Sequence, residues 1–494
     1  MTPTDRSTTL ACCRGITRRS FLADTGMGFT GLALGAMLAR DARTLAAGMN
    51  EAAPSPVIAP PKARSVIWIF LCGGVSHVET FDIKPALTQY DGKSISDTPY
   101  KDALDADRVN KNLVGINPAH GGRTQLMGLQ TGYKKYGESC LEVGDWFQHV
   151  GHRADDLAVV RSLWTIHNDH GTQLTWHTGR HPREGALPTI GAWIAYGLGT
   201  LNQNLPEYVV LGEPTGDCCG GEWTHGAGYL GPEYAGVRLA IDGKEPLPFV
   251  APAGRGVLHE EQAAEFSLIG RLNQLAGIDY PDDADLRARI RSYELAFGMQ
   301  TAVPETLGLE METAATHQLY GLDDKVTEPF GRTCLVARRL VERGVRFVQL
   351  FHGGGGGGAW DSHSEIKKGH GQLSAQVDKP IAGLLADLKQ RGLLNETLVV
   401  CGTEFGRSPG AQGTGRDHHP NGFCAWLAGG GIKGGVIHGA TDELGFFAVE
   451  HPRYVTDIHA TVLHQLGLDA RQLEIPGRRR LDIDRGQPIW DIIA

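Results

Sequence analysis

The sequence predicts a doubly wound α/β fold, in which a mostly parallel sheet carries helices on both faces. Three observations favour it. Short, continuously apolar runs recur along the chain, and such runs are typical of parallel strands buried on both faces. A helical pattern joins two of these runs through short connections, as in a right-handed crossover. Loops rich in glycine and histidine follow the runs, and functional groups of open α/β sheets gather at the carboxyl ends of the strands.

Five apolar runs predict the strands, at residues 65–72, 157–160, 208–211, 345–351 and 397–401. Between the last two runs, apolar residues recur at helical spacing over 373–391, and Gly392 ends the helix. Pro380 either kinks this helix or marks its start. A further helix is expected over 455–466.

The segment 260–343 is charged, favours helix and lacks strand patterns. Its best helical patterns cover residues 261–276 and 285–297. We interpret it as a helical insertion or cover within the larger domain.

Length and composition limit the function classes. A chain of 494 residues, 41% hydrophobic and 21% charged, fits a large α/β domain with insertions and excludes coiled coil or disorder for most of its length. The net charge of −9 argues against a nucleic-acid partner. Glycine (67 residues) and histidine (20 residues) are abundant. Many backbone positions therefore need the freedom of glycine, and many imidazoles are available as ligands or proton carriers.

Residues 1–47 resemble a twin-arginine export signal. Arg18 and Arg19 precede an apolar stretch of small residues that is too short and too rich in Gly and Ala for a stable membrane span. Cleavage is expected near Ala46, with Ala42 as an alternative, and an ordinary amphipathic helix is the other interpretation of the segment. The signal predicts a protein exported to the periplasm or the cell exterior.

Residues 48–63 are rich in Ala and Pro and are expected to be a linker to a single large domain over 64–494. Two of the nine cysteines fall in the predicted signal, which leaves seven, so the count implies no disulfide framework. The absence of a Cys-x-x-Cys pair excludes a zinc ribbon. For the adjacent Cys218 and Cys219, a strained disulfide, a pair of thiols and no special role all stay open.

Polar side chains follow the first predicted strand. Gly73 and Gly74 would let a metal or an oxyanion approach the backbone, and His77 and Asp82 are candidate metal ligands. The alternative is a polar turn in which His77 caps the next helix.

The segment 167–181, after the second predicted strand, contains four imidazoles and the carboxylate of Asp169. If Thr172 opens a helix, its hydroxyl lies at the positive end, where an anionic ester would bind, so Thr172 is a candidate nucleophile. His170 is a candidate proton carrier. The alternative is that Thr172 only caps the helix.

The third constellation follows the strand predicted at 345–351. Six consecutive glycines precede Trp360, Asp361 and His363, and a carboxylate and an imidazole two residues apart can converge on one metal. A flexible connector with both side chains in solvent is the alternative.

The fourth constellation follows the last predicted strand. Glu404 offers an oxygen ligand, His418 or His419 a nitrogen ligand, and Arg407 or Arg416 a bidentate clamp for an anion. A cluster of surface salt bridges is the alternative.

Six motifs occur together behind the twin-arginine leader: Gly-Gly-x-Ser-His-x-x-Thr-Phe-Asp-x-Lys-Pro at 73–85, Trp-Asp-Ser-His at 360–363, Glu-Phe-Gly-Arg at 404–407, Gly-Arg-Asp-His at 415–418, Gly-Gly-Gly-Ile-Lys-Gly-Gly at 429–435 and Gly-Ala-Thr-Asp at 439–442. This set resembles the bacterial domain-of-unknown-function 1501 family over nearly the whole chain after the signal. That family resembles a branch of the alkaline phosphatase and sulfatase superfamily, which implies an alkaline phosphatase-like fold with metals at the strand ends.

The resemblance implies roles for individual residues. Asp361 and His363 resemble the superfamily's carboxylate and imidazole metal pair, Glu404 falls at a further ligand position, and His418 or His419 resembles the late histidine ligand. Asp82 is the nearest substitute for the first-strand carboxylate.

Residues 178–180 resemble the end of the sulfatase nucleophile helix, which places the reactive residue near 169–172. Phe405, however, stands where that superfamily has a metal-binding histidine, and the Cys-x-Pro-Ser-Arg sulfatase signature is absent.

The sequence therefore predicts an exported, metal-dependent hydrolase of phosphate or sulfate esters. Zinc is the expected ion, with calcium or manganese as alternatives. Thr172 or a bound water would attack, His170 would carry protons, and Arg180 or Arg407 would hold the anion. The expected partners are a small anionic ester, or a sulfated or phosphorylated glycan, and the twin-arginine export machinery. The alternative is a catalytically degenerate binding or assembly protein that keeps the fold, and Phe405 favours it.

Overall fold

The computed structural model describes residues 60–104, 123–241, 264, 267–273, 284–469 and 486–494. All of them belong to one compact unit, Pro56–Ala494. The export signal and most of the linker predicted for residues 1–63 lie outside the described residues.

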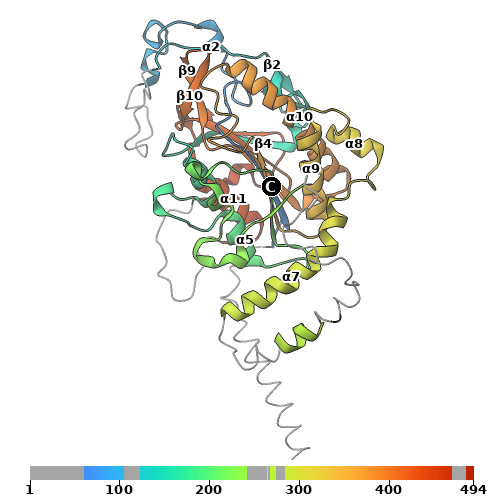
Figure 1. Cartoon of the computed structure of the whole chain (residues 1–494). Helices are drawn as coiled ribbons and strands as arrows, with labels where there is room; N and C mark the ends of the chain where they lie inside the picture. Colours follow the sequence, from blue (N-terminus) through green and yellow to red (C-terminus); the bar gives the residue numbers. More distant parts are fainter. Residues whose placement is uncertain (1–59, 105–122, 242–263, 265–266, 274–283, 470–485) are drawn as a thin grey trace, which may run out of the picture. The chain divides into compact units, whose positions relative to one another are not determined.

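Within the described residues, nine strands form the central sheet in the order β12-β4-β11-β8-β1-β7-β5-β6, and β15 also pairs with β4 (Figure 1). The strands are β1 (Ser65–Leu71), β4 (Leu157–Trp164), β5 (Tyr208–Leu211), β6 (Val237–Leu239), β7 (Phe347–His352), β8 (Thr397–Gly402), β11 (Phe423–Ala428), β12 (Val436–His438) and β15 (Arg453–Tyr454). Each of the five predicted apolar runs forms a strand of this sheet.

The sheet is parallel except at β11, which runs antiparallel to β4 and β8. In the register of β1 with its parallel neighbours, Leu71 pairs with His352 of β7 and Phe70 with Gly402 of β8. The carboxyl ends of these three central strands therefore lie side by side, and the loops that follow them are neighbours.

Both faces of the sheet are buried, which explains why the strands read as continuous apolar runs. Successive residues of β1 alternate between the faces: Ile67 and Ile69 pack in one core, Trp68 and Phe70 in the other. The first core is completed by α9 (Glu328–Glu342) and α10 (Ile366–Gln390), the second by α4 (Thr172–Thr178), α5 (Ile190–Leu198) and α11 (Val455–Gln465). The predicted doubly wound α/β fold is thus confirmed.

The predicted helices can be compared directly with the observed ones. The helix expected over 373–391 is α10, which begins seven residues earlier, at Ile366, and continues through Pro380. The helix expected over 455–466 is α11. In the segment predicted as helical cover, the structure describes α7 (Ala284–Leu307), α8 (Ala314–Tyr320) and α9, whereas the helix expected over 261–276 falls largely outside the described residues.

Smaller elements complete the described part of the chain. Three two-stranded sheets pair β2 (Tyr133–Tyr136) with β3 (Leu141–Gly144), β9 (Gly406–Gln412) with β10 (Gly415–His419), and β13 (Ala440–Thr441) with β14 (Ala448–Glu450). Two short helices are α2 (Pro85–Gln89) and α3 (Gln148–Gly151). The β9–β10 hairpin occupies a segment that the sequence suggested was a loop. A membrane-crossing helix, long and apolar enough for the purpose, is not found among the described residues.

Candidate metal centre

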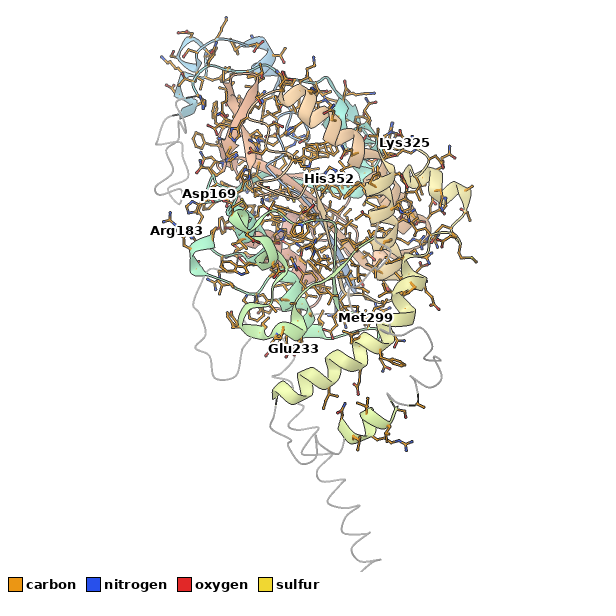
Figure 2. The ribbon with its side chains drawn as sticks, viewed as in Figure 1. Asp169, Arg183, Glu233, Met299, Lys325 and His352 are labelled. Carbon is orange, nitrogen blue, oxygen red and sulfur yellow. The ribbon has the colours of Figure 1, made fainter. Side chains whose placement is uncertain are left out.

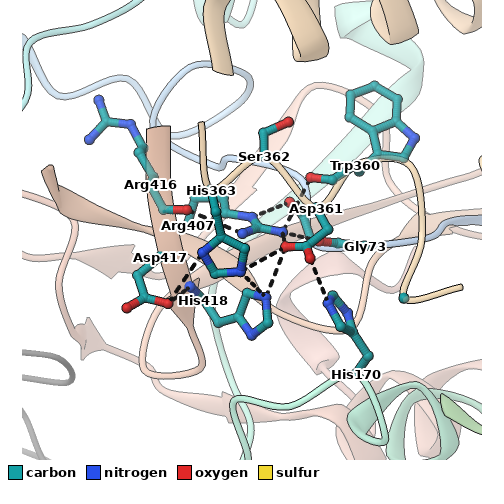
Figure 3. A network of polar contacts seen from close by, with 12 residues as sticks. Gly73, His170, Trp360, Asp361, Ser362, His363, Arg407, Arg416, Asp417 and His418 are labelled. Carbon is teal, nitrogen blue, oxygen red and sulfur yellow. Dashed lines mark hydrogen bonds and ion pairs between the residues drawn. The ribbon is translucent and has the colours of Figure 1, made fainter. Parts of the chain in front are cut away.

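Loops from three strands of the sheet and one outlying hairpin meet at one point (Figure 3). His170 follows β4, Asp361 and His363 follow β7, Glu404 follows β8, and His418 lies on β10. The parallel register brings the ends of these strands together, so residues far apart in the sequence become neighbours. Figure 2 shows His352, the last residue of β7, inside the molecule, and Asp169 at its edge.

The glycines of this region are packed against the site. A Cβ on Gly73, whose φ is +119°, would lie 2.6 Å from the amide nitrogen of Asp361. A Cβ on Gly358 would lie 2.4 Å from the carbonyl carbon of Cys72, and one on Gly357 would lie 2.8 Å from the ring of His170. Four glycines of the run, Gly353, Gly354, Gly357 and Gly358, are therefore closely packed, whereas Gly355 and Gly356 border open space, so most of the run is a wall of the site and not a free connector.

Asp361 is the centre of the cluster, and both of its carboxylate oxygens have partners. Its Oδ1 lies 2.8 Å from Nη2 of Arg407 and 3.0 Å from the Nε2 atoms of both His363 and His418. Its Oδ2 lies 3.2 Å from Nε2 of His170. Three imidazoles therefore direct the same ring nitrogen at one carboxylate.

Hydrogen bonds fix the orientation of the three imidazoles from behind. Nδ1 of His418 donates to the backbone carbonyl of Asn168 (2.5 Å), and Nδ1 of His363 donates to Oε1 of Gln412 (2.5 Å). Nδ1 of His170 donates to Oε1 of Glu404 (3.0 Å). With the proton on Nδ1, a neutral ring presents the lone pair of Nε2 to the cluster, and this is the arrangement that outer partners impose on metal-binding histidines.

The separations between these atoms fit a small divalent ion. Nε2 of His363 and Nε2 of His418 are 3.0 Å apart, and each is 3.0 Å from Oδ1 of Asp361. Neighbouring ligands of a tetrahedral ion, at metal distances of about 2.0 to 2.1 Å, are about 3.3 Å apart. Donor atoms of His170, Asp361 and His418 all lie within 4.8 Å of one another. Nε2 of His170 is buried, and the partner it faces is Oδ2 of Asp361 at 3.2 Å.

Glu404 is fully buried behind His170 and is held from several sides. Its carboxylate accepts hydrogen bonds from the Gly73 amide (2.9 and 3.1 Å) and from the Thr403 hydroxyl (3.0 Å). Because it binds Nδ1 of His170, while Nε2 of the same ring faces Asp361, Glu404 lies outside the ring of ligand atoms. It serves as the outer carboxylate that sets the tautomer of His170.

The charges of the cluster change the pKa values within it. Burial opposes protonation of His170, but its contacts with Asp361 and Glu404 prevail and raise its pKa to about 9. Burial also disfavours the charged form of Asp361, yet His170, His418 and Arg407 together lower its pKa. For His418, burial lowers the pKa despite its contact with Asp361, so this ring is neutral near pH 7.

Arg407 is fully buried, and each of its three side-chain nitrogens has a hydrogen-bond acceptor. It donates to the backbone carbonyls of Gly74 (2.8 Å), Trp360 (3.2 Å) and Arg416 (3.2 Å), to that of Gly73, and to Asp361. We predicted that it would hold the substrate anion, and the structure contradicts this. The left-handed glycine turn directs carbonyl oxygens at the guanidinium, so Arg407 fixes Asp361 and the Gly73-Gly74 turn in place.

Arg416, the other predicted clamp, is also fully buried. Its guanidinium bonds to the carboxylate of Glu79 at 2.5 Å and to four backbone carbonyls. The pair with Glu79 therefore fastens the β9–β10 hairpin, which carries His418, to the loop after β1.

Phe405 forms the buried floor of the cluster. Its ring stacks on His418 with centroids 4.4 Å apart and contacts the ring of His170 at 5.5 Å. A Cβ on Gly74 would lie 2.5 Å from the Phe405 ring, so only glycine fits there. The residue that departs from the superfamily pattern thus packs against two of the candidate ligands.

Sequence reasoning missed a buried histidine that supports the site. His370, on α10, accepts a hydrogen bond from the Ser76 amide through Nε2 (3.1 Å), so its Nδ1 donates to Oγ of Ser362 (3.1 Å). Burial lowers its pKa well below 6.5, which keeps the ring neutral and this arrangement intact. His370 also packs edge-on against Trp360. Since a lone histidine within a helix pattern has no distinguishing signal, the sequence offered no means of finding it.

Three predicted metal ligands lie outside the cluster. Nε2 of His77 bonds to the carbonyl of Gly445 (2.9 Å), and Nε2 of His419 bonds to that of Phe446. Asp82 pairs with Lys84 at 3.0 Å. The prediction that His77, Asp82 and His419 are ligands is therefore not supported by the structure, because each side chain is committed to a structural partner elsewhere.

Two predicted catalytic residues are also placed away from the exposed side of the cluster. Thr172 begins α4, as expected, but it is fully buried and its hydroxyl makes no hydrogen bond with the described residues. A substrate could not reach it in this conformation. Arg180 follows the opposite end of α4, about 10 Å of helix from Thr172. His170, predicted as a proton carrier, uses both ring nitrogens within the cluster.

The adjacent cysteines lie on the outer side of the glycine wall. Both are free thiols; Cys218 is exposed, with its Sγ 3.9 Å from the carbonyl of Gly356, and Cys219 is buried. Burial and the neighbouring Cys218 thiol raise the pKa of Cys219 to about 12. Of the alternatives left open by the sequence, the structure therefore shows two free thiols and not a strained disulfide.

Solved structures similar to this chain include three enzymes of distant sequence. The phosphonate monoester hydrolase SpPMH from Silicibacter pomeroyi is 11% identical, the match covers 87% of this chain and 76% of that one, and the TM-score is 0.35. The lipoteichoic acid synthase LtaP from Listeria monocytogenes is 7% identical; the match covers 83% of this chain and 73% of that one, and the TM-score is 0.36. The PsFucS1 sulfatase from Pseudoalteromonas sp. is 14% identical; the match covers 66% of this chain and 63% of that one, and the TM-score is 0.32.

Because these TM-scores are below 0.5, the functional proposals for this chain rest on the contacts within its own site. No curated protein sequence matches the chain. Residues 63–493 match the family described as a protein of unknown function, DUF1501, which confirms the resemblance predicted from the motifs, and the chain belongs to that family.

Proposed function

We propose that this protein is an exported, metal-dependent hydrolase of phosphate or sulfate esters. The observation that carries the proposal is the convergence of three Nε2 atoms, from His170, His363 and His418, on the carboxylate of Asp361. Each ring is locked by a hydrogen bond from Nδ1 to an oxygen atom. Such a set of donors, with side chains that are only partly buried, supports a metal centre open to a ligand from solvent.

The donor set favours zinc. Imidazole nitrogens and one carboxylate suit zinc and other transition ions, whereas calcium takes six to eight oxygen ligands. Manganese stays an alternative, and calcium, the other ion suggested by the sequence, is poorly matched by a site of this composition. When bound, the ion would polarise the ester oxygen and make a bound water more acidic.

The chain's own residues would hold and orient this centre. Asp361, His170 and His418 bind the ion, Glu404 keeps the His170 ring in the required tautomer, and Arg407 keeps the carboxylate of Asp361 in position. Since Thr172 is fully buried, we propose water as the nucleophile, and since Arg407 is fully buried, we do not assign it to the substrate. The substrate's anionic group would then be recognised at the exposed rim of the cluster.

The substrate class, a small anionic ester or a sulfated or phosphorylated glycan, is part of the proposal, as is export through the twin-arginine machinery. Arg18-Arg19 and the following apolar stretch support export, and they lie outside the described residues. The net charge of −9 gives no general attraction for an anionic substrate, so the positive charge that attracts it would be local, at the centre or at its rim.

The test is ester hydrolysis by the purified, zinc-loaded protein. Aryl phosphate, aryl phosphonate, aryl sulfate and sulfated oligosaccharide substrates are compared for the wild type, Asp361→Asn and His418→Ala. His149→Ala, at an exposed position remote from the cluster, is the matched control. We expect turnover in the wild type and the control and at least a hundredfold loss in the two site variants. Activity that is equal in all four proteins would contradict the proposal.

A second function is favoured by a specific observation. The guanidinium of Arg407 is held by backbone carbonyls, and Nε2 of His363 adds a further donor 3.0 Å from both Asp361 and His418. A structural metal site is closed by four protein ligands. The same geometry therefore suits a binding or assembly protein in which the ion stabilises the fold. This protein would bind zinc and lose stability with chelator, yet hydrolyse none of the esters.

A further inference from the structure

We propose that His363 is an exchangeable ligand of this centre. In the resting protein it would occupy a coordination position, and it would give that position up to water or to the anionic group of a substrate. His170, Asp361 and His418 would stay in place. The inference rests on the metal site of the proposed function, and it states how one site can have four donors and still admit a substrate.

The first observation is the difference in exposure among the three imidazoles. The side chain of His363 is 36% exposed, whereas those of His170 and His418 are each 12% exposed. In Figure 3, His363 and His418 lie next to each other on one side of the Asp361 carboxylate, and His170 approaches from the other. A ligand that leaves must exchange its contacts for water, and only His363 already has a large share of its surface there.

The second observation is how each ring is held. His418 is anchored to a backbone carbonyl and stacks on Phe405, and His170 is anchored to the fully buried Glu404 and also contacts Phe405. His363 is anchored to a side-chain amide, that of Gln412, which is itself only half-buried. The centroid of its ring lies 4.6 Å from that of His418. Among the ring contacts of the described residues, none joins His363 to Phe405.

The third observation is that the backbone at His363 is fixed, so exchange requires only rotation of a side chain. The amide of Arg416 bonds to the carbonyl of Ser362 (3.2 Å), and the amide of Glu365 bonds to the hydroxyl of Thr414 (2.9 Å). A Cβ on Gly415 would lie 2.3 Å from the carbonyl carbon of His363, which shows how closely β10 packs there. Rotation of a partly exposed side chain is fast compared with enzyme turnover.

The fourth observation is that residues near His363 and on both sides of Gln412 border open space. An open groove of about 590 Å³ runs beside the loop. Its lining includes Glu365, Lys367 and Lys368, which follow His363 in the chain, and Ala411, Gly413 and Thr414, which flank Gln412. The segments that hold His363 thus form walls of the groove, and the groove also offers two lysines to an incoming anion.

Together these observations assign a hierarchy to the donors. Three protein ligands with an open fourth position are the pattern of catalytic zinc sites, and four protein ligands are the pattern of structural ones. His363 would convert the site between the two patterns, closing it at rest and opening it when an anion arrives.

The experiment measures the affinity for Co²⁺ by competition with a chromophoric chelator, and the visible spectrum of the Co²⁺-loaded protein. The proteins are the wild type, His363→Ala, His418→Ala and Gln412→Glu. We expect His363→Ala to lose about tenfold in affinity and His418→Ala to lose at least a further tenfold. Gln412→Glu, which gives His363 a charged acceptor, should bind Co²⁺ more tightly than the wild type.

Inorganic phosphate provides the second readout. Added to the wild-type Co²⁺ protein, it should change the visible spectrum as His363 is displaced, and the result should approach the spectrum of His363→Ala with phosphate. Gln412→Glu should need more phosphate for the same change. The proposal is overturned if His363→Ala and His418→Ala lose equal affinity, because His363 is then a permanent ligand. It is also overturned if His363→Ala changes neither affinity nor spectrum.

These readouts do not depend on catalysis. A protein that binds Co²⁺ with the expected ranking and spectral change, yet hydrolyses no ester, would contradict the hydrolase and leave the exchangeable ligand standing. A protein that hydrolyses esters but shows equal losses for the two histidine variants would do the reverse.

Discussion

Nε2 of His418 lies 3.0 Å from Oδ1 of Asp361, although both atoms are acceptors when the imidazole is neutral. The ring is neutral near pH 7 because burial lowers its pKa, and its proton is on Nδ1, which donates to a backbone carbonyl. A contact between two lone pairs is unfavourable unless a cation lies between them. This relationship is the strongest single indication that the cluster is built for a metal ion.

Binding of a divalent ion should raise the stability of the folded protein. An ion that binds only the folded state at one hundred times its dissociation constant adds about 2.7 kcal/mol to the free energy of unfolding. Thermal unfolding of chelator-treated protein, with and without added Zn²⁺, measures the effect. The unfolding temperature should rise with Zn²⁺ and return when chelator is added; an unchanged temperature would contradict the metal centre.

Asp361→Asn should abolish tight metal binding with little change in side-chain volume. The substitution removes the carboxylate charge that the three Nε2 atoms face, and it leaves the buried Arg407 without the charge of its partner Asp361. We expect at least a tenfold loss of affinity and a lower free energy of unfolding. Asp417→Asn is the comparison variant, because Asp417 contacts the cluster through the His418 amide (2.8 Å) and Nδ1 of His363 (3.7 Å) rather than through an Nε2 atom. Its affinity should change less than threefold by isothermal titration.

Glu404→Gln and Glu404→Ala should separate the outer carboxylate's two roles. Glutamine keeps an acceptor for the Gly73 amide but lacks the charge that orients His170, so we expect a 10- to 100-fold loss of metal affinity in a stable protein. Alanine also leaves buried donors unpaired, which costs about 1 to 3 kcal/mol for each. Urea unfolding measures the free energy of unfolding of both variants, and metal titration measures their affinity for the ion. If the two variants had equal free energies of unfolding, the hydrogen bonds that Glu404 accepts would not stabilise the folded protein as expected.

Gly74→Ala should distort the floor of the site. The residue has a φ of +89°, and an added Cβ would lie 2.5 Å from the Phe405 ring. Gly92→Ala is the control, because Gly92 also has a positive φ (+73°) but has nothing within 4 Å of the added atom. Backbone strain alone costs about 1 to 2 kcal/mol, so Gly92→Ala should lose that much and bind metal normally. Gly74→Ala should lose more and bind metal more weakly, and a loss equal to the control's would refute the close fit.

Acid should destabilise the protein through buried histidines outside the cluster. Burial lowers the pKa values of His225, His352 and His459 to about 4, whereas an unfolded histidine titrates near pH 6.5. Below pH 6.5 the unfolded chain therefore binds more protons. Each residue contributes about 3 kcal/mol of stability that is complete above pH 6.5 and is lost as the pH falls toward 4.

His459→Gln tests this pH dependence at one position. The amide of glutamine can still donate to the carbonyl of Trp176, which His459 contacts at 2.7 Å, but it cannot be protonated. Between pH 7 and pH 4.5, the free energy of unfolding should fall by about 2 to 3 kcal/mol less in the variant than in the wild type. Parallel urea titrations at the two pH values measure this, and an equal fall would show that His459 does not titrate as expected.

Much of the fold and the membership of the site could be predicted from the sequence. The apolar runs identify five strands because both faces of a parallel sheet are buried, so each strand reads as a continuous apolar segment. The rule that strand ends gather at one edge then brings His170, Asp361 and Glu404 together. The strand β11 was missed, since it follows the β9–β10 hairpin without a helix and runs antiparallel.

The errors have a common physical origin, which is side-chain direction. His418 and His419 are adjacent on β10, and adjacent side chains of a strand point to opposite faces, so only one of them can face the cluster. Because the segment gives no strand pattern, the sequence could not choose between them. Arg407 looks like an anion clamp in the sequence because nothing there reveals that two left-handed glycines direct their carbonyl oxygens at it.

The most direct test of the central claim is the stoichiometry and affinity of divalent metal binding to the full chain. We predict one Zn²⁺ or Co²⁺ per chain in the wild type, bound with a dissociation constant that rises at least a hundredfold when Asp361→Asn and His418→Ala are combined. A wild-type protein that binds no divalent ion, or a double variant that binds it as tightly as the wild type, would contradict the metal centre.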